Sequence, residues 1–152
     1  MGVTSMKFTK MQGCGNDYIY VNCFAEDLPE GERPAFSRKV SDRHFGAGSD
    51  GLICICPSDK ADFLMDMYNA DGSRAEMCGN GIRCVAKYVF ERGMTDKTVI
   101  DVETGAGVKT LWLNVDDGKV ESVRVCMGTP EFEPAKIPVD ASGTAFIDQP
   151  VE

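Results

Sequence analysis

The hydrophobic pattern of the chain predicts two helices. Over residues 81–93 the apolar side chains fall on one stripe, with the spacing i, i+3, i+4, i+7 and i+8. The stripe consists of Ile82, Val85, Ala86, Val89 and Phe90. Gly93 follows it, at the position where helices commonly end in a left-handed glycine. A second helix is predicted over residues 33–45, with Pro34 near its start and Gly46 beyond its end.

Most of the remaining pattern predicts β-strands, because it consists of short runs rich in β-branched, aromatic and apolar residues between turn residues. The predicted strands are residues 17–24, 52–56, 63–68, 98–103, 108–115 and 119–127. Asp117 and Gly118 separate the last two strands and are typical of a tight hairpin turn. After about residue 127 the periodicity disappears and four of the seven prolines follow, which indicates a linker, a tail or the opening of a further domain.

Composition and charge narrow the classes of partner. The formal net charge of −8 argues against nucleic acid and membrane surfaces, which usually attract basic proteins. No apolar run reaches the roughly 18 residues of a membrane span, and the first ten residues contain no apolar segment typical of a secretory signal. Seven scattered cysteines, an odd number, indicate reduced thiols rather than a disulfide framework. We therefore expect a cytoplasmic protein.

Three motifs that suggest chemistry do not hold up. The segment GAGSDG (46–51) matches a dinucleotide-binding fingerprint, but such a fingerprint follows a strand and opens a helix, and here the predicted order is reversed. Cys54 and Cys56 have no second pair of ligands at zinc spacing. His44 is the only histidine, and a lone histidine is more often structural than catalytic. We expect no metal site.

Cys78 is the residue for which the sequence supplies a means of activation. If the helix predicted over residues 81–93 begins near Asn80, the free N–H groups and the positive dipole end of its first turn stabilise a thiolate at Cys78. The same N–H groups can bind a carboxylate, and Gly79 and Gly81 permit close approach of the backbone. The alternative is that Cys78, like Cys84 beside the apolar stripe, serves as a small buried hydrophobic residue.

Four blocks of the sequence resemble the diaminopimelate epimerase family. They are KMQGCGNDYIYV (10–21), RHFGAGSDGL (43–52), NADGSRAEMCGNGIRC (69–84) and MGTPEFEPAKIP (127–138), and they occur in the family's order. The resemblance extends over residues 6 to about 140. It implies an α+β fold in which mostly antiparallel strands pack around a central helix. This unit would be one of two pseudo-symmetric domains that enclose the active site between them.

The resemblance also implies an activity and its residues. Members of the family interconvert L,L- and meso-diaminopimelate for lysine and peptidoglycan synthesis without a cofactor. One thiolate removes the α-proton, and a second thiol protonates the opposite face. Cys78 matches the first catalytic cysteine, and Asn16, Asn69, Gly79 and Asn80 match positions that bind the amino-acid substrate.

The chain is about half as long as members of that family. We therefore expect residues 1–126 to form the N-terminal domain, and residues 127–152 to be a tail or the start of an incomplete second domain. The second catalytic cysteine would lie in the missing C-terminal domain. So would the glutamate and arginine that hold the substrate's α-amino and carboxylate groups. The expectation is half of an active site, inactive alone, with the C-terminal domain as its partner.

Two other functions stay open. An exposed apolar cleft face also favours a homodimer, or a non-catalytic domain that binds a partner through this face. A thiol redox protein could use Cys78 and Cys84, but residues six apart on a helix point in different directions, which argues against that function.

Overall fold

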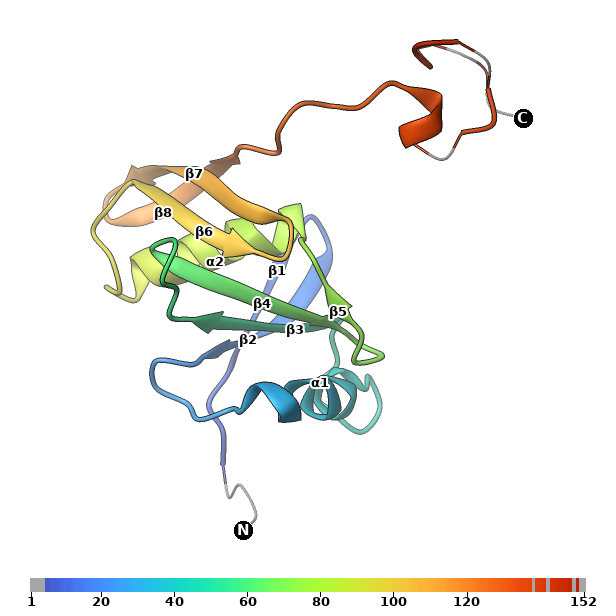
Figure 1. Ribbon diagram of the computed structural model, residues 1–152. Coiled ribbons are helices and arrows are strands. Elements are labelled where there is room, and N and C mark those ends of the chain that lie inside the picture. Colours follow the sequence, from blue (N-terminus) through green and yellow to red (C-terminus); the bar gives the residue numbers. More distant parts are fainter. Residues whose placement is uncertain (1–4, 138, 142, 149, 151–152) are drawn as a thin grey trace.

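The strands form one continuous sheet that curls around a central helix (Figure 1). The computed structural model describes residues 5–137, 139–141, 143–148 and 150. The order of strands across the sheet is β1-β2-β3-β4-β6-β7-β8, with β5 paired to β4. The strands are β1 (Thr9–Gly13), β2 (Asn16–Asn22), β3 (Gly51–Cys56), β4 (Phe63–Asn69), β5 (Arg74–Ala75), β6 (Val99–Thr104), β7 (Gly107–Asp116) and β8 (Lys119–Val125).

Two helices account for the two parallel pairs in a mostly antiparallel sheet. The pairs β2/β3 and β4/β6 are parallel, and a parallel pair needs a crossover connection, which is usually a helix. The crossovers contain α1 (Arg33–Ser41) and α2 (Gly79–Glu91), and short 3₁₀ turns form at Glu30–Glu32 and Pro134–Lys136. The predicted architecture, mostly antiparallel strands around a central helix, is confirmed.

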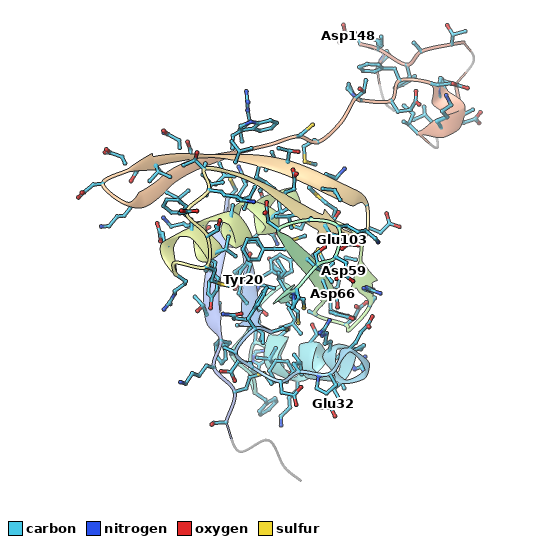
Figure 2. The ribbon with its side chains drawn as sticks, turned by 60° about the vertical axis from the view of Figure 1, so that its left-hand side comes forward. Tyr20, Glu32, Asp59, Asp66, Glu103 and Asp148 are labelled. Atoms are coloured by element: carbon cyan, nitrogen blue, oxygen red, sulfur yellow. The ribbon has the colours of Figure 1, made fainter. Side chains whose placement is uncertain are left out.

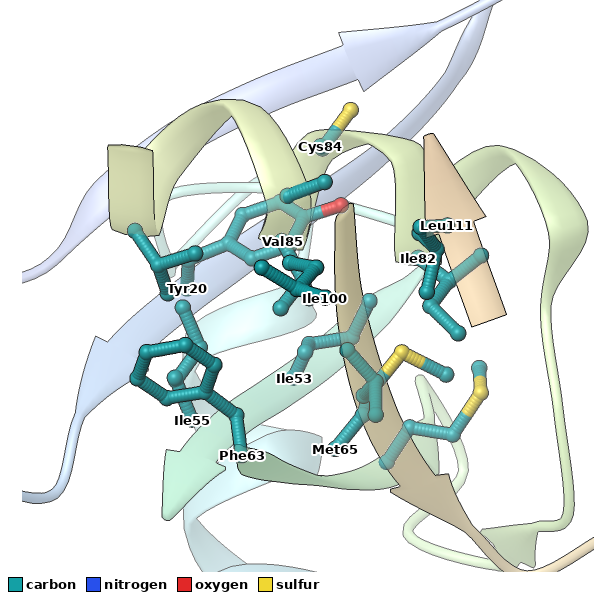
Figure 3. Packing of buried hydrophobic residues seen from close by; sticks show 14 of the residues in the cluster. Tyr20, Ile53, Ile55, Phe63, Met65, Ile82, Cys84, Val85, Ile100 and Leu111 are labelled. Atoms are coloured by element: carbon teal, nitrogen blue, oxygen red, sulfur yellow. The ribbon is translucent and has the colours of Figure 1, made fainter. Parts of the chain in front are cut away.

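The inner face of the sheet packs on the predicted apolar stripe of α2 (Figure 3). Ile82, Val85, Ala86 and Val89 have no exposed surface, whereas Phe90 is only half-buried. They contact strand residues that include Tyr20, Ile53, Ile55, Met65, Ile100 and Leu111. Burying one such aliphatic side chain contributes about 1.5–3 kcal/mol, so this cluster fixes the position of α2.

The outer face of β2, β3 and β4 packs against α1. A second cluster of buried side chains lies there: Ile19, Val21, Leu28, Val40, Leu52, Cys54, Cys56 and Tyr68. Because helices cover both faces of β3, all six of its residues are buried. This explains why the predicted strand 52–56 is continuously apolar rather than alternating.

A buried carboxylate joins α1 to the sheet. The Asp66 side chain on β4 is 1% exposed and pairs with Arg33 at 2.7 Å and Arg74 at 2.8 Å. The Tyr68 hydroxyl donates to it at 2.9 Å. A buried charge is tolerated only when it is paired in this way. Asp66 therefore ties the first residue of α1 and the short strand β5 to the middle of the sheet (Figure 2).

The prediction of a helix over residues 33–45 is wrong at the C-terminal end. α1 stops at Ser41 because the Asp42 carboxylate accepts the backbone N–H groups of His44 and Phe45 at 2.7 and 2.8 Å. Such a local turn competes with helical hydrogen bonds. The chain then turns back at Gly46, whose N–H donates to the Asp42 carbonyl at 2.9 Å.

Strand limits were less well predicted than strand positions. The strand predicted over 17–24 ends at Asn22, whose side chain accepts the Phe24 N–H at 3.0 Å and turns the chain. The strand predicted over 119–127 ends at Val125. Strands β1 and β5 were missed. β1 is a short edge strand with no apolar run, and β5 has only two residues.

The two predicted turns are confirmed. Asp117 and Gly118 both have positive φ, 45° and 72°, as a two-residue type I′ hairpin requires. Gly93 has φ 67°, and its N–H donates to the Phe90 carbonyl while that of Met94 donates to the Val89 carbonyl. This is the glycine-ended Schellman motif.

Beyond β8 the chain leads away from the curled sheet (Figure 1). The only helical turn in the described part of this segment is Pro134–Lys136. The division of the chain near residue 126 into a domain and a further segment stays a prediction.

An ion-pair cluster on the surface joins the beginning of β2 to the loop after α1. Arg43 pairs with Asp17 at 2.7 Å and with Asp50 at 2.9 Å, and Lys10 pairs with Asp17 at 3.1 Å. The Arg43 guanidinium lowers the pKa of Asp17 from 3.8 to about 2. The cluster therefore stabilises the folded chain only while Asp17 is ionised.

A first prediction concerns Gly46. A Cβ at this position would lie 2.4 to 2.8 Å from the backbone carbonyl oxygens of Lys39, Val40 and Asp42. Backbone atoms cannot yield as a flexible side chain does, so Gly46→Ala should lower the free energy of unfolding by about 1–3 kcal/mol. Urea titration followed by circular dichroism measures it. The control is Gly31→Ala, where a Cβ meets nothing within 4 Å. An equal midpoint for the two variants would contradict the close approach.

A second prediction concerns acid stability. Because the folded pKa of Asp17 lies below its unfolded value, its contribution is complete above about pH 4 and is lost as the pH falls towards 2. Asp17→Asn should therefore show a smaller loss of urea midpoint between about pH 5 and about pH 2.5 than the unaltered chain. The exposed Asp140 supplies the control, Asp140→Asn. Identical acid sensitivity in all three proteins would rule out the effect.

Candidate active site

The Cys78 thiol caps the N-terminus of α2. Cys78 has an extended backbone, with φ −136° and ψ 114°, and its Sγ accepts the Gly81 N–H at 3.3 Å. An oxygen of Ser, Thr, Asp or Asn usually fills this position. A donated N–H and the positive end of the helix both stabilise a thiolate. The activation expected from the sequence therefore has a structural basis, with α2 beginning one residue earlier than predicted.

Gly81 makes this turn possible. A Cβ at Gly81 would lie 2.6 Å from Ile53 Cδ1 and 3.5 Å from Cys78 Sγ. Ile53 is fully buried and cannot move aside freely. The absence of a side chain thus lets the first turn of α2 approach both β3 and the thiol.

Asn16 is the second predicted residue that the fold brings to the thiol. It begins β2, and its Oδ1 accepts the Cys78 thiol hydrogen at 3.1 Å across 62 residues of sequence. The thiol therefore donates to Asn16 and accepts from the Gly81 N–H, and the Tyr18 hydroxyl also interacts with it. The contacts with Asn16 and Gly81 favour opposite protonation states of the sulfur.

Two buried tyrosines of β2 surround the same corner. Burial raises the pKa of Tyr18, and the nearby Cys78 raises it further. Burial likewise raises the pKa of Tyr20, whose hydroxyl donates to the Gly81 carbonyl at 3.3 Å. Both phenols are therefore neutral at physiological pH, and the thiol faces no tyrosinate charge from β2.

Gly79 and Asn80 form the first turn of α2 beside Cys78. Helix geometry leaves their N–H groups without a carbonyl partner one turn back, so they can bind an anion. The Asn80 Oδ1 accepts from the Arg83 guanidinium, which holds this side chain in place. Both residues border a shallow groove that Met127 also lines.

Asn69 lies at the same edge of the sheet without contacting the thiol. It ends β4, and its amide donates to Ser73 Oγ at 3.0 Å. The following Ala70 N–H donates to the Asp50 carbonyl at 3.0 Å, and the Asp50 carboxylate reaches Asn16 at 2.6 Å. Asn69 is thus connected to the thiol through Asp50 rather than directly.

Asp50 and Arg43 are site residues that sequence reasoning did not single out. Asp50 Oδ2 accepts the Asn16 Nδ2 at 2.6 Å and the Asp17 N–H at 3.0 Å, while Oδ1 pairs with Arg43. Both lie in the block 43–52, which carried part of the family resemblance. That block was the available signal, although the resemblance assigned no role to Asp50 or Arg43.

The described residues hold no group of three or more His, Cys, Asp and Glu side chains that could bind a metal ion. No helix in the described part of the chain is long and apolar enough to cross a membrane.

Comparison with known proteins finds relatives of this chain over most of its length. The family model described as Diaminopimelate epimerase matches residues 8–133. The diaminopimelate epimerase of Agathobacter rectalis is 65% identical over 94% of this chain, and that of Acetivibrio thermocellus is 61% identical over 97%. These matches cover 50% and 52% of the two relatives. The chain thus spans about half the length of the curated relatives it matches.

Solved structures share the fold at low sequence identity. A probable proline racemase from Agrobacterium radiobacter K84 aligns over 80% of this chain and 41% of its own, with a TM-score of 0.64 and 16% identity. A methylitaconate-delta-isomerase aligns over 74% of this chain and 35% of its own, with a TM-score of 0.62 and 16% identity. The curled sheet around α2 is therefore a known architecture. The match of the family model over residues 8–133 shows that the chain belongs to the diaminopimelate epimerase family.

Proposed function

We propose that this chain supplies the first thiol of a cofactor-independent epimerase that acts on diaminopimelate. The observation that carries the proposal is the position of Cys78 as the N-cap of α2, between the Gly81 N–H and the Asn16 amide. The names of the relatives supply the substrate, because they are diaminopimelate epimerases.

The proposed step is a proton transfer at the α-carbon. The Cys78 thiolate takes the α-proton to form an S–H bond, and the electron pair of the broken C–H bond delocalises into the substrate carboxylate. Because α-protons of amino acids are weakly acidic, the developing charge needs stabilisation by fixed donors. The N–H groups of Gly79 and Asn80 would supply it, with the Asn16 amide beside the thiol. Reprotonation from the opposite face completes the inversion and needs a second thiol.

The other cysteines of the chain are poor candidates for that second thiol. Burial raises the pKa of Cys84, which disfavours the thiolate that the second thiol needs in the reverse direction. Cys54 and Cys56 are buried on the α1 side of the sheet, opposite α2, and Cys23 packs against the same cluster. Cys14 and Cys126 are exposed at strand ends, where the surrounding solvent would screen a developing carbanion. We therefore assign the second thiol to the half of the enzyme that the relatives have beyond this match.

The third prediction tests the proposal by hydrogen exchange. The reduced chain is incubated with meso- or L,L-diaminopimelate in D₂O, and α-deuterium is followed by mass spectrometry. We expect little exchange by the chain alone, because half of the pocket is open to solvent. Addition of the separately produced C-terminal half of the Agathobacter rectalis relative should restore exchange by at least about 100-fold, a typical contribution of one general acid or base.

Two variants and one mass measurement make the test decisive. Cys78→Ala should abolish the restored exchange, whereas Cys126→Ala, at an exposed cysteine outside the α2 corner, should leave it unchanged. Light scattering shows whether the two halves associate. Association without exchange would refute catalysis and favour the alternative, a domain that only binds a partner. Exchange that survives Cys78→Ala would refute the role of Cys78.

A further inference from the structure

We propose that Asp50 is a positioning residue that determines which end of the Asn16 amide faces the Cys78 thiol. The inference rests on the proposed function of Cys78 as an acid and base. It adds a residue that does not touch the thiol and that acts through Asn16, a residue expected to bind the substrate.

The hydrogen bonds of the Asp50 carboxylate determine which end of the Asn16 amide faces it. An ionised carboxylate only accepts hydrogen bonds, whereas an asparagine amide has one accepting and one donating end. Asp50 receives three donors: Asn16 Nδ2 at 2.6 Å, the Asp17 N–H at 3.0 Å and Arg43 at 2.9 Å. The donating end of Asn16 must therefore face Asp50.

The position of the donating end of the Asn16 amide determines where its accepting end points. With Nδ2 held by Asp50, Oδ1 is turned towards Cys78 and accepts its thiol hydrogen at 3.1 Å. The reversed amide would place two acceptors, the Asn16 and Asp50 oxygens, against each other. Asp50 thus fixes an orientation that neither Asn16 nor Cys78 could fix alone.

This orientation has a chemical consequence at the sulfur. Acceptance by Asn16 Oδ1 stabilises the protonated thiol, and donation by the Gly81 N–H stabilises the thiolate. A thiol that removes a proton in one direction of a reversible reaction must return it in the other. Two opposed hydrogen bonds keep both forms accessible, and Asp50 supplies one side of this balance.

The other ionisable groups around the thiol do not obscure this balance. Tyr18 and Tyr20 on β2 and Cys84 on α2 each interact electrostatically with Cys78. Burial raises the pKa of all three, which favours their neutral forms. The charged groups nearest to Asn16 are Asp50 itself and the Arg43, Asp17 and Lys10 cluster.

The fourth prediction replaces the carboxylate by an amide. In Asp50→Asn the new side chain can donate to Asn16 Oδ1, which frees Asn16 Nδ2 to turn to the sulfur and stabilise the thiolate. The rate of Cys78 alkylation by iodoacetamide is measured against pH, resolved by mass spectrometry of the Cys78 peptide. Its midpoint should shift down by about one pH unit, as expected for one gained hydrogen bond to a charged group. The Cys126 peptide, read in the same samples, should keep its midpoint.

A double-mutant cycle separates orientation from the mere loss of a negative charge. Asp17→Asn removes a carboxylate from the same cluster, and Asn16→Ala removes the amide that Asp50 orients. Asp17→Asn should shift the alkylation midpoint by less than about half as much as Asp50→Asn does. The same limit should hold for Asp50→Asn made in the Asn16→Ala background, compared with Asn16→Ala alone. An undiminished shift without Asn16 would overturn the proposal, as would no shift in Asp50→Asn alone.

Folding and catalysis are checked independently. Circular dichroism establishes that each variant is folded. If Asp50→Asn does not fold, Asp50→Gln against Asp50→Glu repeats the contrast of amide and carboxylate. The alkylation readout needs no substrate, so its result stands even where the exchange experiment refutes the epimerase. Conversely, exchange that depends on Cys78, without the pH shift, would leave the proposed function intact and reject the role of Asp50.

Discussion

The burial of α2 against the inner face of the curled sheet is the constraint on which the rest of the structure depends. Ile82 and Val85 are fully buried, and the Tyr20 hydroxyl holds the Gly81 carbonyl at the helix start. A rotation by one residue, about 100°, would bring polar side chains such as Arg83 into the core, so the stripe permits one orientation. The location of the Cys78 thiol is thus a consequence of hydrophobic packing, since the thiol is the residue at which this fixed helix begins.

The strand topology then determines which polar residues reach that thiol. β2 and β3 are parallel, so their first residues lie at one edge of the sheet, and the antiparallel β4 ends at the same edge. Asn16 begins β2, Asp50 directly precedes β3, and Asn69 ends β4. Three residues that are distant in sequence therefore meet at one edge. The parallel pairing that brings them together exists because α1 forms the crossover between β2 and β3.

The sequence pattern was sufficient where a local physical cause determined the structure. The α2 stripe, the glycine at its end and the type I′ turn each follow from spacing and backbone preference alone. The pattern failed where a side chain bonded to its own backbone, as Asp42 does to end α1. It also failed at β1, an edge strand held by backbone bonds to β2 rather than by apolar residues. At the site, the helix N-terminus at Cys78 followed from the residues, whereas Asn16 came only from the resemblance. The contact between Asp50 and Asn16 depends on strand register, which composition does not reveal.

A cysteine at an N-cap differs in kind from the oxygen residues that usually occupy it. A hydroxyl or amide cap satisfies helix N–H groups and stays unchanged, whereas a thiol can lose its proton and still cap the helix. The hydrogen bond from the Gly81 N–H stabilises the thiolate, and the hydrogen bond to Asn16 stabilises the protonated thiol. The two contacts therefore favour opposite protonation states of the sulfur. Such fixed dipoles act strongly only where water is excluded, because the solvent screens them otherwise. Gly79 and Asn80 at the helix start border an open groove, so the same contacts should gain strength if that groove is covered.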